Sequence, residues 1–444
     1  MIFSYRPLII MITAAVLSSG VSLQLGAQNV DALRQEEDPD VVGLTLQSAE
    51  ELALTHNRDI MNAGIDIQKA EAQKWQAIAT MLPQVSASLD YTSTFNHKMD
   101  FGQMSIAIPN TGTIGITSAV ALSGSQVVGV MIANISKKMS DISLRKTRRV
   151  IVDEVRTLYC NALVLERTIE LLEENHTSLK KLHEMSEASV SVGVSEQTAA
   201  DQLLVQVNSM ADNISSTKRS LEVVYNTMRL LLGMDDKVEI KLLQTLDSLV
   251  DEKEIKALLA EEFNIDNNYD YQLLAKSTEL ARRQMTLAGW SNGPTLSVFH
   301  QYSGKKYFSD EMHMDMTPPN TFGVQLNIPI FTSLKNTMNY KSAKLSYRQQ
   351  LNTMKYMETS LRLQYRQQAY NLNSTMERYH TQEFNIKVAR RVFDNTAKKY
   401  EYGVSSSMEV TQAMTSLVTA QSSYIQSLLE MVTAQISLAQ LLNK

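Results

Sequence analysis

One apolar stripe, repeated in two halves of the chain, constrains the fold more than any other feature of the sequence. From Ile151, apolar residues recur in alternating steps of four and three, a spacing that keeps one narrow helix face against a partner helix. The stripe stops at 193–195 (Gly-Val-Ser) and then resumes up to Leu231. Because glycine tolerates the backbone of a tight helix end, the pattern predicts a long helical hairpin. At about 1.5 Å per residue, the arm from Ser125 to Gly193 would span about 100 Å.

The same pattern appears again about 210 residues later. A second Gly-Val-Ser occupies 403–405, with stripes before and after it. Ahead of each hairpin an Asn precedes a Pro by 26 residues: Asn57 and Pro83, then Asn268 and Pro294. These matches predict a tandem duplication of one long unit. We expect a first repeat over 44–234, a second over 266–444, and a connecting segment over 235–265 that folds against the helices as an equatorial collar.

Each repeat is expected to begin with a shorter helix that ends at its proline. The first would run from Thr45 to about Met81, and the second over 267–294. After each proline the apolar period changes to two, the period of a β-strand. The alternation predicts four strands of about ten residues, over 85–92, 114–122, 296–303 and 322–330, with a polar loop over 96–111. One apolar and one small or polar face fits a membrane β-barrel wall, and equally a half-buried sheet in a soluble domain.

If the strands form a barrel wall, their alternation assigns its two faces. Ile114, Ile116, Val324 and Leu326 would face lipid, and Thr117, Gln325 and Asn327 would face water. Four strands cannot close a spanning barrel, since the smallest barrels need about eight. An open sheet edge cannot lie in lipid either, because its backbone groups would have no partners. A membrane location therefore requires several copies of the chain.

The N-terminus indicates export. Residues 1–27 contain Arg6, an apolar run over 8–17 and small residues up to Ala27, the three parts of a secretory signal peptide; a retained anchor is the alternative. Residues 28–43 are polar and acidic and are expected to form a linker. After Ala27 no apolar run approaches 18 residues, so no other helical membrane span is expected. The single cysteine, Cys160, excludes an intramolecular disulfide and is expected to be a small buried side chain.

The chain carries few signs of catalytic or metal chemistry. It has no Gly-rich phosphate loop, HExxH or GxSxG motif, so we expect neither an enzyme nor a bound cofactor. A net charge of −5 with dispersed Lys and Arg does not favour nucleic-acid binding. The segment 312–316 (Met-His-Met-Asp-Met) has ligands that suit soft copper or silver ions. A polar surface loop in a methionine-rich chain is the alternative, and we assign no metal site.

The order of elements over 45–444 resembles that of the TolC family of outer-membrane efflux proteins. The Asn and Pro pairs, the paired Gly-Val-Ser turns and the segment 327–331 (Asn-Ile-Pro-Ile-Phe) carry this resemblance. It implies a mainly α fold with a β-barrel portion, assembled as a homotrimer. Three chains would supply twelve strands to one outer-membrane β-barrel and twelve helical strands to a periplasmic α-helical barrel.

The resemblance also implies where functional residues lie. The two tips would dock a periplasmic adaptor protein through Gly193, Val194, Ser195, Gly403, Val404 and Ser405. The pore entrance would include Tyr400, Glu409, Gln412 and Asp201. Family members commonly carry acids six and nine positions after the second tip glycine; here Glu409 is acidic and Gln412 is neutral. Ser405 replaces a basic residue and Ala199 an acidic one, so closure by packing and hydrogen bonds is expected instead of an ion pair.

The implied function is a passive exit duct in the cell outer membrane that extends into the periplasm. It would work with the adaptor and with an inner-membrane transporter of the RND or ABC type in a tripartite efflux system. The duct of a type I protein-secretion system is an alternative that the residues do not separate. A soluble periplasmic helical scaffold is an alternative of a different class, and it predicts recovery in the soluble periplasmic fraction.

Overall fold

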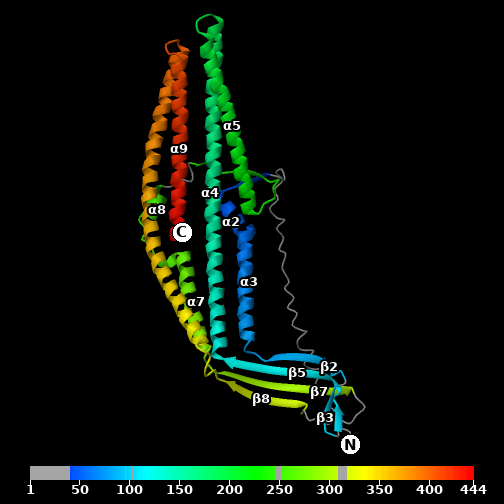
Figure 1. Cartoon of the computed structure of the whole chain (residues 1–444). Coiled ribbons are helices and arrows are strands. Elements are labelled where there is room, and N and C mark those ends of the chain that lie inside the picture. Colours follow the sequence, from blue (N-terminus) through cyan, green and yellow to red (C-terminus); the bar gives the residue numbers. More distant parts are fainter. Residues whose placement is uncertain (1–40, 96, 103, 247–251, 309–317) are drawn as a thin grey trace.

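The computed structural model describes residues 41–444 except 96, 103, 247–251 and 309–317 (Figure 1). The expected signal peptide, nearly all of the linker and the segment 312–316 lie outside the described residues. Within the described ranges, no helix combines the length and hydropathy needed to cross a membrane.

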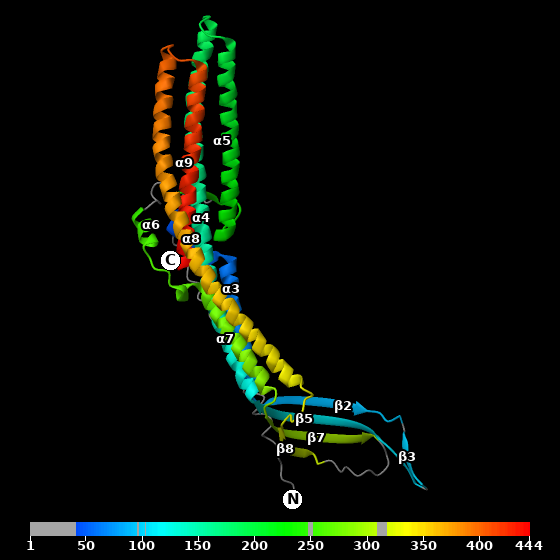
Figure 2. The ribbon, with the colours of Figure 1, turned by 60° about the vertical axis from the view of Figure 1, so that its left-hand side comes forward.

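Two helical hairpins lie side by side in one long arm (Figures 1 and 2). In the first, α4 (Gly124–Ser191, 68 residues) reverses into α5 (Gln197–Leu232). In the second, α8 (Lys335–Glu401, 67 residues) reverses into α9 (Ser407–Leu442). At about 1.5 Å per residue, α4 and α8 are each about 100 Å long. The predicted long helical hairpins are confirmed, and the residues between their helices are 192–196 and 402–406.

Shorter helices lie beside the lower parts of the long ones (Figure 1). They are α2 (Leu46–His56), α3 (Arg58–Ala79) and α7 (Tyr269–Trp290). The single helix expected from Thr45 to Met81 is wrong, because Asn57 has an extended backbone (φ −65°, ψ 128°) that ends α2 and caps α3. Asn268 caps α7 with nearly the same backbone angles.

The two asparagines each join two helix ends. The Asn57 Oδ1 accepts hydrogen bonds from two N–H groups in the first turn of α3, at 2.9 and 3.2 Å. Its Nδ2 donates to the Leu231 carbonyl at the end of α5, at 2.9 Å. Asn268 repeats this arrangement, with Nδ2 donating to the Leu441 carbonyl of α9 at 3.3 Å. Both residues are buried. A side chain with a donor and an acceptor is needed here, which explains why Asn occurs in both repeats.

The predicted strands form one antiparallel sheet that projects sideways from the foot of the helices (Figures 1 and 2). The strand order is β2 (Gln84–Thr92), β5 (Asn110–Ser123), β7 (Thr295–Phe308) and β8 (Asn320–Asn327). The expected polar loop over 96–111 differs from the structure, because it contains a small hairpin of β3 (Lys98–Phe101) and β4 (Met104–Ala107). In the described part of the sheet, β2 and β8 are the edge strands.

The strand register aligns the apolar sides of all four strands on one face of the sheet. Ala87 lies opposite Ile116, which in turn lies opposite Tyr302. Val298 lies opposite Val324. Directly opposite residues share a face, so the predicted apolar positions Ile114, Ile116, Val324 and Leu326 lie together, with 45–62% of their surface exposed. Thr117, Gln325 and Asn327 lie on the other face. That the apolar face meets lipid stays a prediction.

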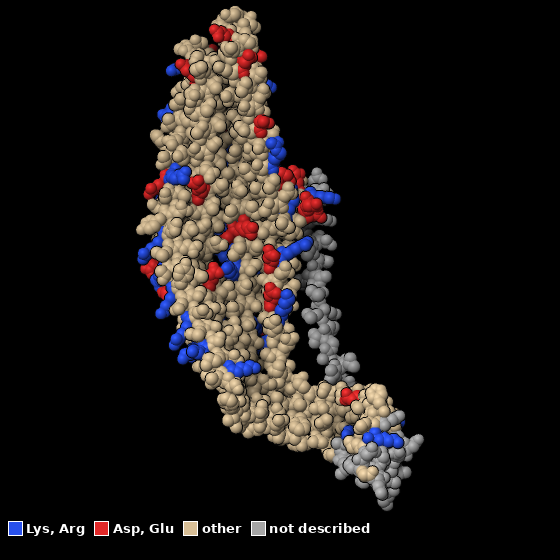
Figure 3. Space-filling view, in the orientation of Figure 1, with Lys and Arg blue, Asp and Glu red and all other residues tan. Residues whose placement is uncertain are grey.

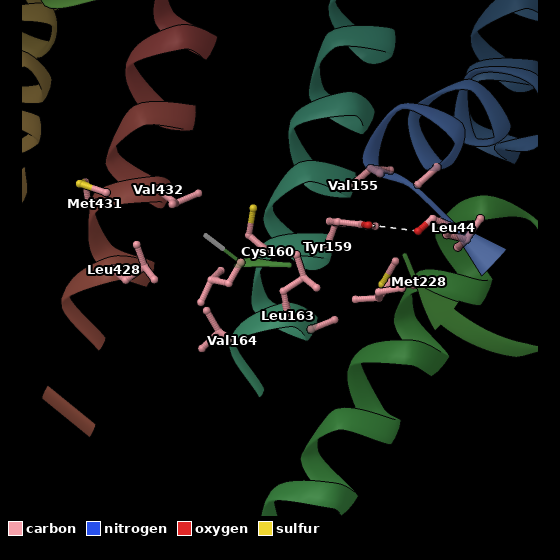
Figure 4. Close-up of a cluster of buried hydrophobic side chains, with 14 of the residues drawn as sticks. Leu44, Val155, Tyr159, Cys160, Leu163, Val164, Met228, Leu428, Met431 and Val432 are labelled. Carbon is pink, nitrogen blue, oxygen red and sulfur yellow. Dashed lines mark hydrogen bonds between the residues drawn. The ribbon is translucent and has the colours of Figure 1, made fainter. Parts of the chain in front are cut away.

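Two apolar clusters fill the helical arm. The lower cluster joins α2, α4, α5 and α9 around Tyr159, whose hydroxyl donates to the Leu44 carbonyl at 3.1 Å (Figure 4). On the side of α4 that faces α9, Cys160 is buried as expected, and burial raises its pKa to about 11 (Figure 4). The upper cluster, nearer the tips, contains Leu179, Leu203, Met210, Phe393, Val410 and Leu417.

The segment between the repeats packs around the lower cluster. Its strand β6 (Glu239–Leu242) pairs in parallel with β1 (Val41–Leu44), so 41–43 form a strand where a linker is expected. The segment continues through α6 (Glu252–Leu259) and a short 3-10 helix, η3 (Ile265–Asn267). Ile255 of α6 is fully buried. The ring of Phe263 stacks on that of Tyr365 of α8, with centroids 5.2 Å apart.

Candidate functional site

The two hairpin tips have the same backbone structure. Gly193 and Gly403 both have φ of +74°, a left-handed conformation that favours glycine. One residue beyond each glycine, the backbone N–H reaches back into the helix: Val194 donates to the Ser189 carbonyl at 2.9 Å, and Val404 donates to the Lys399 carbonyl at 2.8 Å. These are Schellman caps, which satisfy carbonyls at the helix end. The primary structural role of both glycines is therefore to allow the chain to reverse at the end of the helix.

The tips expose apolar side chains to solvent. Val194 and Val404, the central residues of the two Gly-Val-Ser turns, are 80% and 75% exposed. Three neighbours that the sequence analysis did not single out are also largely exposed: Val192, Tyr402 and Met408. Most of the surface of these apolar side chains is therefore accessible to solvent in the single chain. Such exposed patches commonly mark interaction sites.

A groove with a volume of about 700 Å³ lies between the two tips. Five of the predicted site residues line it: Val194, Ser195, Tyr400, Gly403 and Ser405. The two turns, 210 residues apart in sequence, therefore lie next to one another at one end of the arm (Figure 1). The half-buried side chain of Tyr400 packs against the upper apolar cluster.

Glu409 is held at the start of α9. Its Oε2 accepts hydrogen bonds from the Ser405 hydroxyl and from the Ser406 N–H, the latter at 3.2 Å. The Ser406 hydroxyl in return accepts the Glu409 N–H at 3.2 Å, which completes a capping box. The hydrogen bond from Ser405 and then that from Ser406 lower the pKa of Glu409, with a smaller contribution from Lys399. The carboxylate is thus anionic, exposed and fixed in position.

The other predicted pore residues are not gathered with Glu409 inside one chain. Asp201 is exposed and accepts a hydrogen bond from the Gln197 side chain at 2.9 Å. Gln412 is exposed one turn beyond Glu409 on α9. Neither residue lines the groove between the tips, and neither does Glu409. Their role at a pore entrance remains a prediction that requires neighbouring chains.

The role of Ser406 was missed from the sequence, although its signal is present. The spacing Ser-x-x-Glu over 406–409 is a capping-box motif that marks the start of a helix. The first hairpin lacks it: Glu196, which precedes α5, makes no side-chain capping hydrogen bond. The two tips therefore share a turn but differ in the helix start that follows. Among the described residues, no group of three or more His, Cys, Asp or Glu is placed to hold a metal ion.

Solved structures with the same fold are outer-membrane channels. CusC is 17% identical, with a TM-score of 0.75 over 93% of this chain and 95% of that chain. The CmeC channel of Campylobacter jejuni is 15% identical, with a TM-score of 0.76 over 93% of this chain and 90% of that one. VceC of Vibrio cholerae is 14% identical, with a TM-score of 0.73 over 89% and 95%. Among curated protein sequences, none matches the chain.

The family comparison covers both repeats. The model of the family described as outer membrane efflux protein matches 50–234 and 265–444. These ranges contain both hairpins and all four strands of the sheet. The family consists of channel proteins rather than enzymes, and the structural neighbours are outer-membrane channels that extend into the periplasm. The chain belongs to the outer membrane efflux protein family.

Proposed function

We propose that three copies of this chain form the passive exit duct of a tripartite efflux system. The observation that carries the proposal is a four-stranded sheet with one aligned apolar face and two edge strands, joined to helical hairpins about 100 Å long. Such a sheet suits a membrane, and such helices suit a conduit across the periplasm. Since one chain has too few strands for a barrel, three chains would supply twelve, with β2 of one chain pairing β8 of the next.

The exposed surface of the helices supports assembly. Large apolar side chains lie on solvent-exposed faces of α3 and α8, including Trp75 (61% exposed), Tyr370 (77%) and Phe384 (65%). Contact between neighbouring chains in a closed helical barrel would remove these side chains from water. Burial of apolar area is favourable by about 25 cal/mol per Å².

We place partner docking at the tips and the pore entrance beside them. The exposed valines of both turns would contact a periplasmic adaptor protein, which links the duct to an inner-membrane transporter. Three copies of Glu409 would form an anionic ring, and such rings favour cations. Tyr400 would help to close the pore by packing, because Ser405 and Ala199 supply no ion pair. No observation favours a protein-secretion duct over this function.

Membrane fractionation followed by electrophoresis with and without heating tests the proposal. A trimer-sized species in the outer-membrane fraction, dissociated by heating, is the expected result. Recovery of the chain in the soluble periplasmic fraction would contradict it and favour the helical scaffold. V404D then tests docking separately, because it changes an exposed side chain of the tip and leaves the turn glycine in place: transport should fail while trimers remain in the membrane. V404I, which keeps an apolar side chain at the same exposed position, provides the matched control.

A further inference from the structure

A single lysine lies among aromatic side chains at the far end of the apolar sheet face. In the strand register, Tyr91 of β2 is opposite Gly112 of β5, and Gly112 is opposite Lys306 of β7. Phe308 follows two residues later on the same face. Lys306 therefore shares the face of Ile114, where a charge is unexpected. Figure 3 shows few charged side chains on the sheet near the helices and several Lys or Arg at its far end.

The lysine is held beside two aromatic rings. The Lys306 ammonium lies 5.7 Å from the centroid of the Phe308 ring, within the range of a cation–π contact. Tyr91 meets Phe308 edge to face, with centroids 5.9 Å apart. Gly112 leaves room for this arrangement, since a Cβ there would lie 3.2 Å from the Phe308 ring. We call Tyr91, Lys306 and Phe308 the lysine–aromatic cluster; all three residues are exposed.

The length of β7 places this cluster one membrane thickness from the helices. Leu296, at the other end of the apolar face, lies next to Trp290 at the foot of the helices. Ten residues separate Leu296 from Lys306, which is about 33 Å along a strand. With the tilt of about 40° usual for barrel strands, this length spans about 25 Å along the membrane normal, the height of the apolar band. The cluster then lies at the outer interface, where aromatic girdles occur and charge is tolerated.

We propose that the lysine–aromatic cluster binds the phosphate group of an anionic lipid in the outer leaflet. The inference rests on the proposed function, because it requires the apolar face to lie in the membrane. The ammonium would pair with the phosphate, while the amphipathic Tyr91 ring and the Phe308 ring pack at the border of headgroup and acyl chain. Charge complementarity and the position at the interface favour a lipid over a soluble anion, for which one exposed ammonium is a weak site.

Lys305 provides a matched control. It precedes Lys306 on β7, is also exposed, and lies opposite Thr113, whose parity is that of the small and polar sheet face. Two lysines with the same side chain and nearly the same height in the sheet therefore point to opposite faces. A lipid contact should depend on Lys306 and not on Lys305.

The test uses full-length trimers that have been delipidated in detergent and titrated with lipid A, followed by native mass spectrometry. K306Q should lower lipid A binding about fivefold, as expected for one lysine at an anionic membrane surface, whereas K305Q and K306R should bind as the native chain does. Equal loss in K305Q and K306Q, or equal binding of dephosphorylated lipid A, would overturn the proposal. Displacement by millimolar inorganic phosphate would also overturn it, since the site would then be one for free anions.

The two hypotheses fail in different ways. If K306Q binds lipid A normally but still forms heat-sensitive trimers in the outer membrane, only the lipid site is wrong. If the native chain is not found in the outer membrane, the proposed function itself is wrong. Should K306Q assemble poorly, K306R keeps the charge and isolates the contribution of charge from that of assembly.

Discussion

At the residue scale, Glu409 shows how one side chain serves two structural tasks. As a helix-start residue it completes the capping box of α9, and its carboxylate also accepts the Ser405 hydroxyl. Ser405 stands where the resembling family commonly has a basic residue, and it orients the acid without neutralising it. The acid therefore keeps its charge in a fixed place beside the tip.

The first prediction concerns this charge. Since hydrogen bonds from Ser405 and Ser406 lower the pKa of Glu409, the carboxylate stays ionised as pH falls, until the pH passes that lowered pKa. In the trimeric channel, E409Q should reduce cation selectivity. S405A should raise the pH at which the same selectivity is lost, because it removes the largest cause of the shift. Reversal potentials measured across a salt gradient between neutral and acidic pH test both variants.

Two results would contradict this prediction. An unchanged reversal potential in E409Q would remove Glu409 from the ion path. An identical pH midpoint in S405A and the native channel would show that Ser405 does not set the charge state. T415A, at an exposed position of α9 outside the predicted pore entrance, is the control and should leave the pH midpoint unchanged.

The second prediction concerns Asn57, whose side chain joins the start of α3 to the end of α5. N57D keeps the acceptor that caps α3 but loses the donor to Leu231 and sets a negative charge beside that carbonyl. N57A loses both interactions. Each variant should lower the free energy of unfolding by about 1–3 kcal/mol, the usual cost of losing a helix cap or leaving a buried polar group unpaired. Guanidinium unfolding followed by circular dichroism measures this change.

The exposed Asn208 of α5 provides the comparison for Asn57. N208A should change stability by less than about 0.5 kcal/mol, as is typical of surface substitutions. If N57D is as stable as the native chain, the bond to Leu231 contributes nothing, and the second Asn in the duplicated position needs another explanation.

At the scale of elements, three successive residues of α4 contact three different helices. Glu173 pairs with Lys218 of α5 at 2.7 Å, and Glu174 pairs with Arg390 of α8 at 3.0 Å. The Asn175 Nδ2 donates to the Gln421 Oε1 of α9 at 2.6 Å. The two glutamates are about half exposed, and each is paired with a basic side chain of another helix.

This polar layer separates the two apolar clusters of the arm. On α4 it lies between Leu171 of the lower cluster and Leu179 of the upper one, and on α9 it lies between Leu417 and Ile425. Asn175 and Gln421 are each 3% exposed, and the Gln421 Nε2 has no hydrogen-bond partner. A buried amide pair costs stability but admits few alternative alignments of the helices.

The third prediction follows from this amide pair. N175L should destabilise the arm by about 1–3 kcal/mol because it leaves the Gln421 amide buried without any partner. The double variant N175L/Q421L should recover most of that loss, since an apolar pair needs no hydrogen bond. A double-mutant cycle in guanidinium measures the coupling; additive effects of the two substitutions would contradict it. E173Q should cost under about 1 kcal/mol, as exposed ion pairs do.

Features with a local signal could be predicted from the sequence, and features set by distant contacts could not. The hairpins and strands were predictable because the spacing of apolar residues and the turn glycines are signals that lie within a few residues of each other. The break at Asn57 depends on Leu231, and the pairing of β1 with β6 joins residues almost 200 apart. Of the candidate site, the turns and Tyr400 lie together in the groove. The positions of Glu409, Gln412 and Asp201 around a pore depend on neighbouring chains, so the sequence and structure of a single chain do not determine them.

At the scale of the whole molecule, the helical arm has buried apolar clusters within one chain, whereas the apolar face of the four-stranded sheet is exposed. The arm has two buried clusters of its own, whereas the sheet has no second layer in the described part of the chain. Its apolar face remains exposed, from Leu326 beside the helices to Phe308 at the far end. We expect the arm to form first and the sheet to gain most of its stability from neighbouring chains and lipid.

The last prediction separates lipid from water on adjacent residues of β8. Val324 is 62% exposed and Gln325 is also exposed, so burial within one chain does not distinguish them. Their faces do: Val324 is opposite Val298, and Gln325 is opposite Ser297. If the apolar face lies in lipid, V324R should cost about 2–4 kcal/mol and Q325R much less. The yield of heat-sensitive trimer in the outer membrane, compared between the two variants, measures this difference. Equal yields would mean that the sheet does not have one face in lipid and one in water.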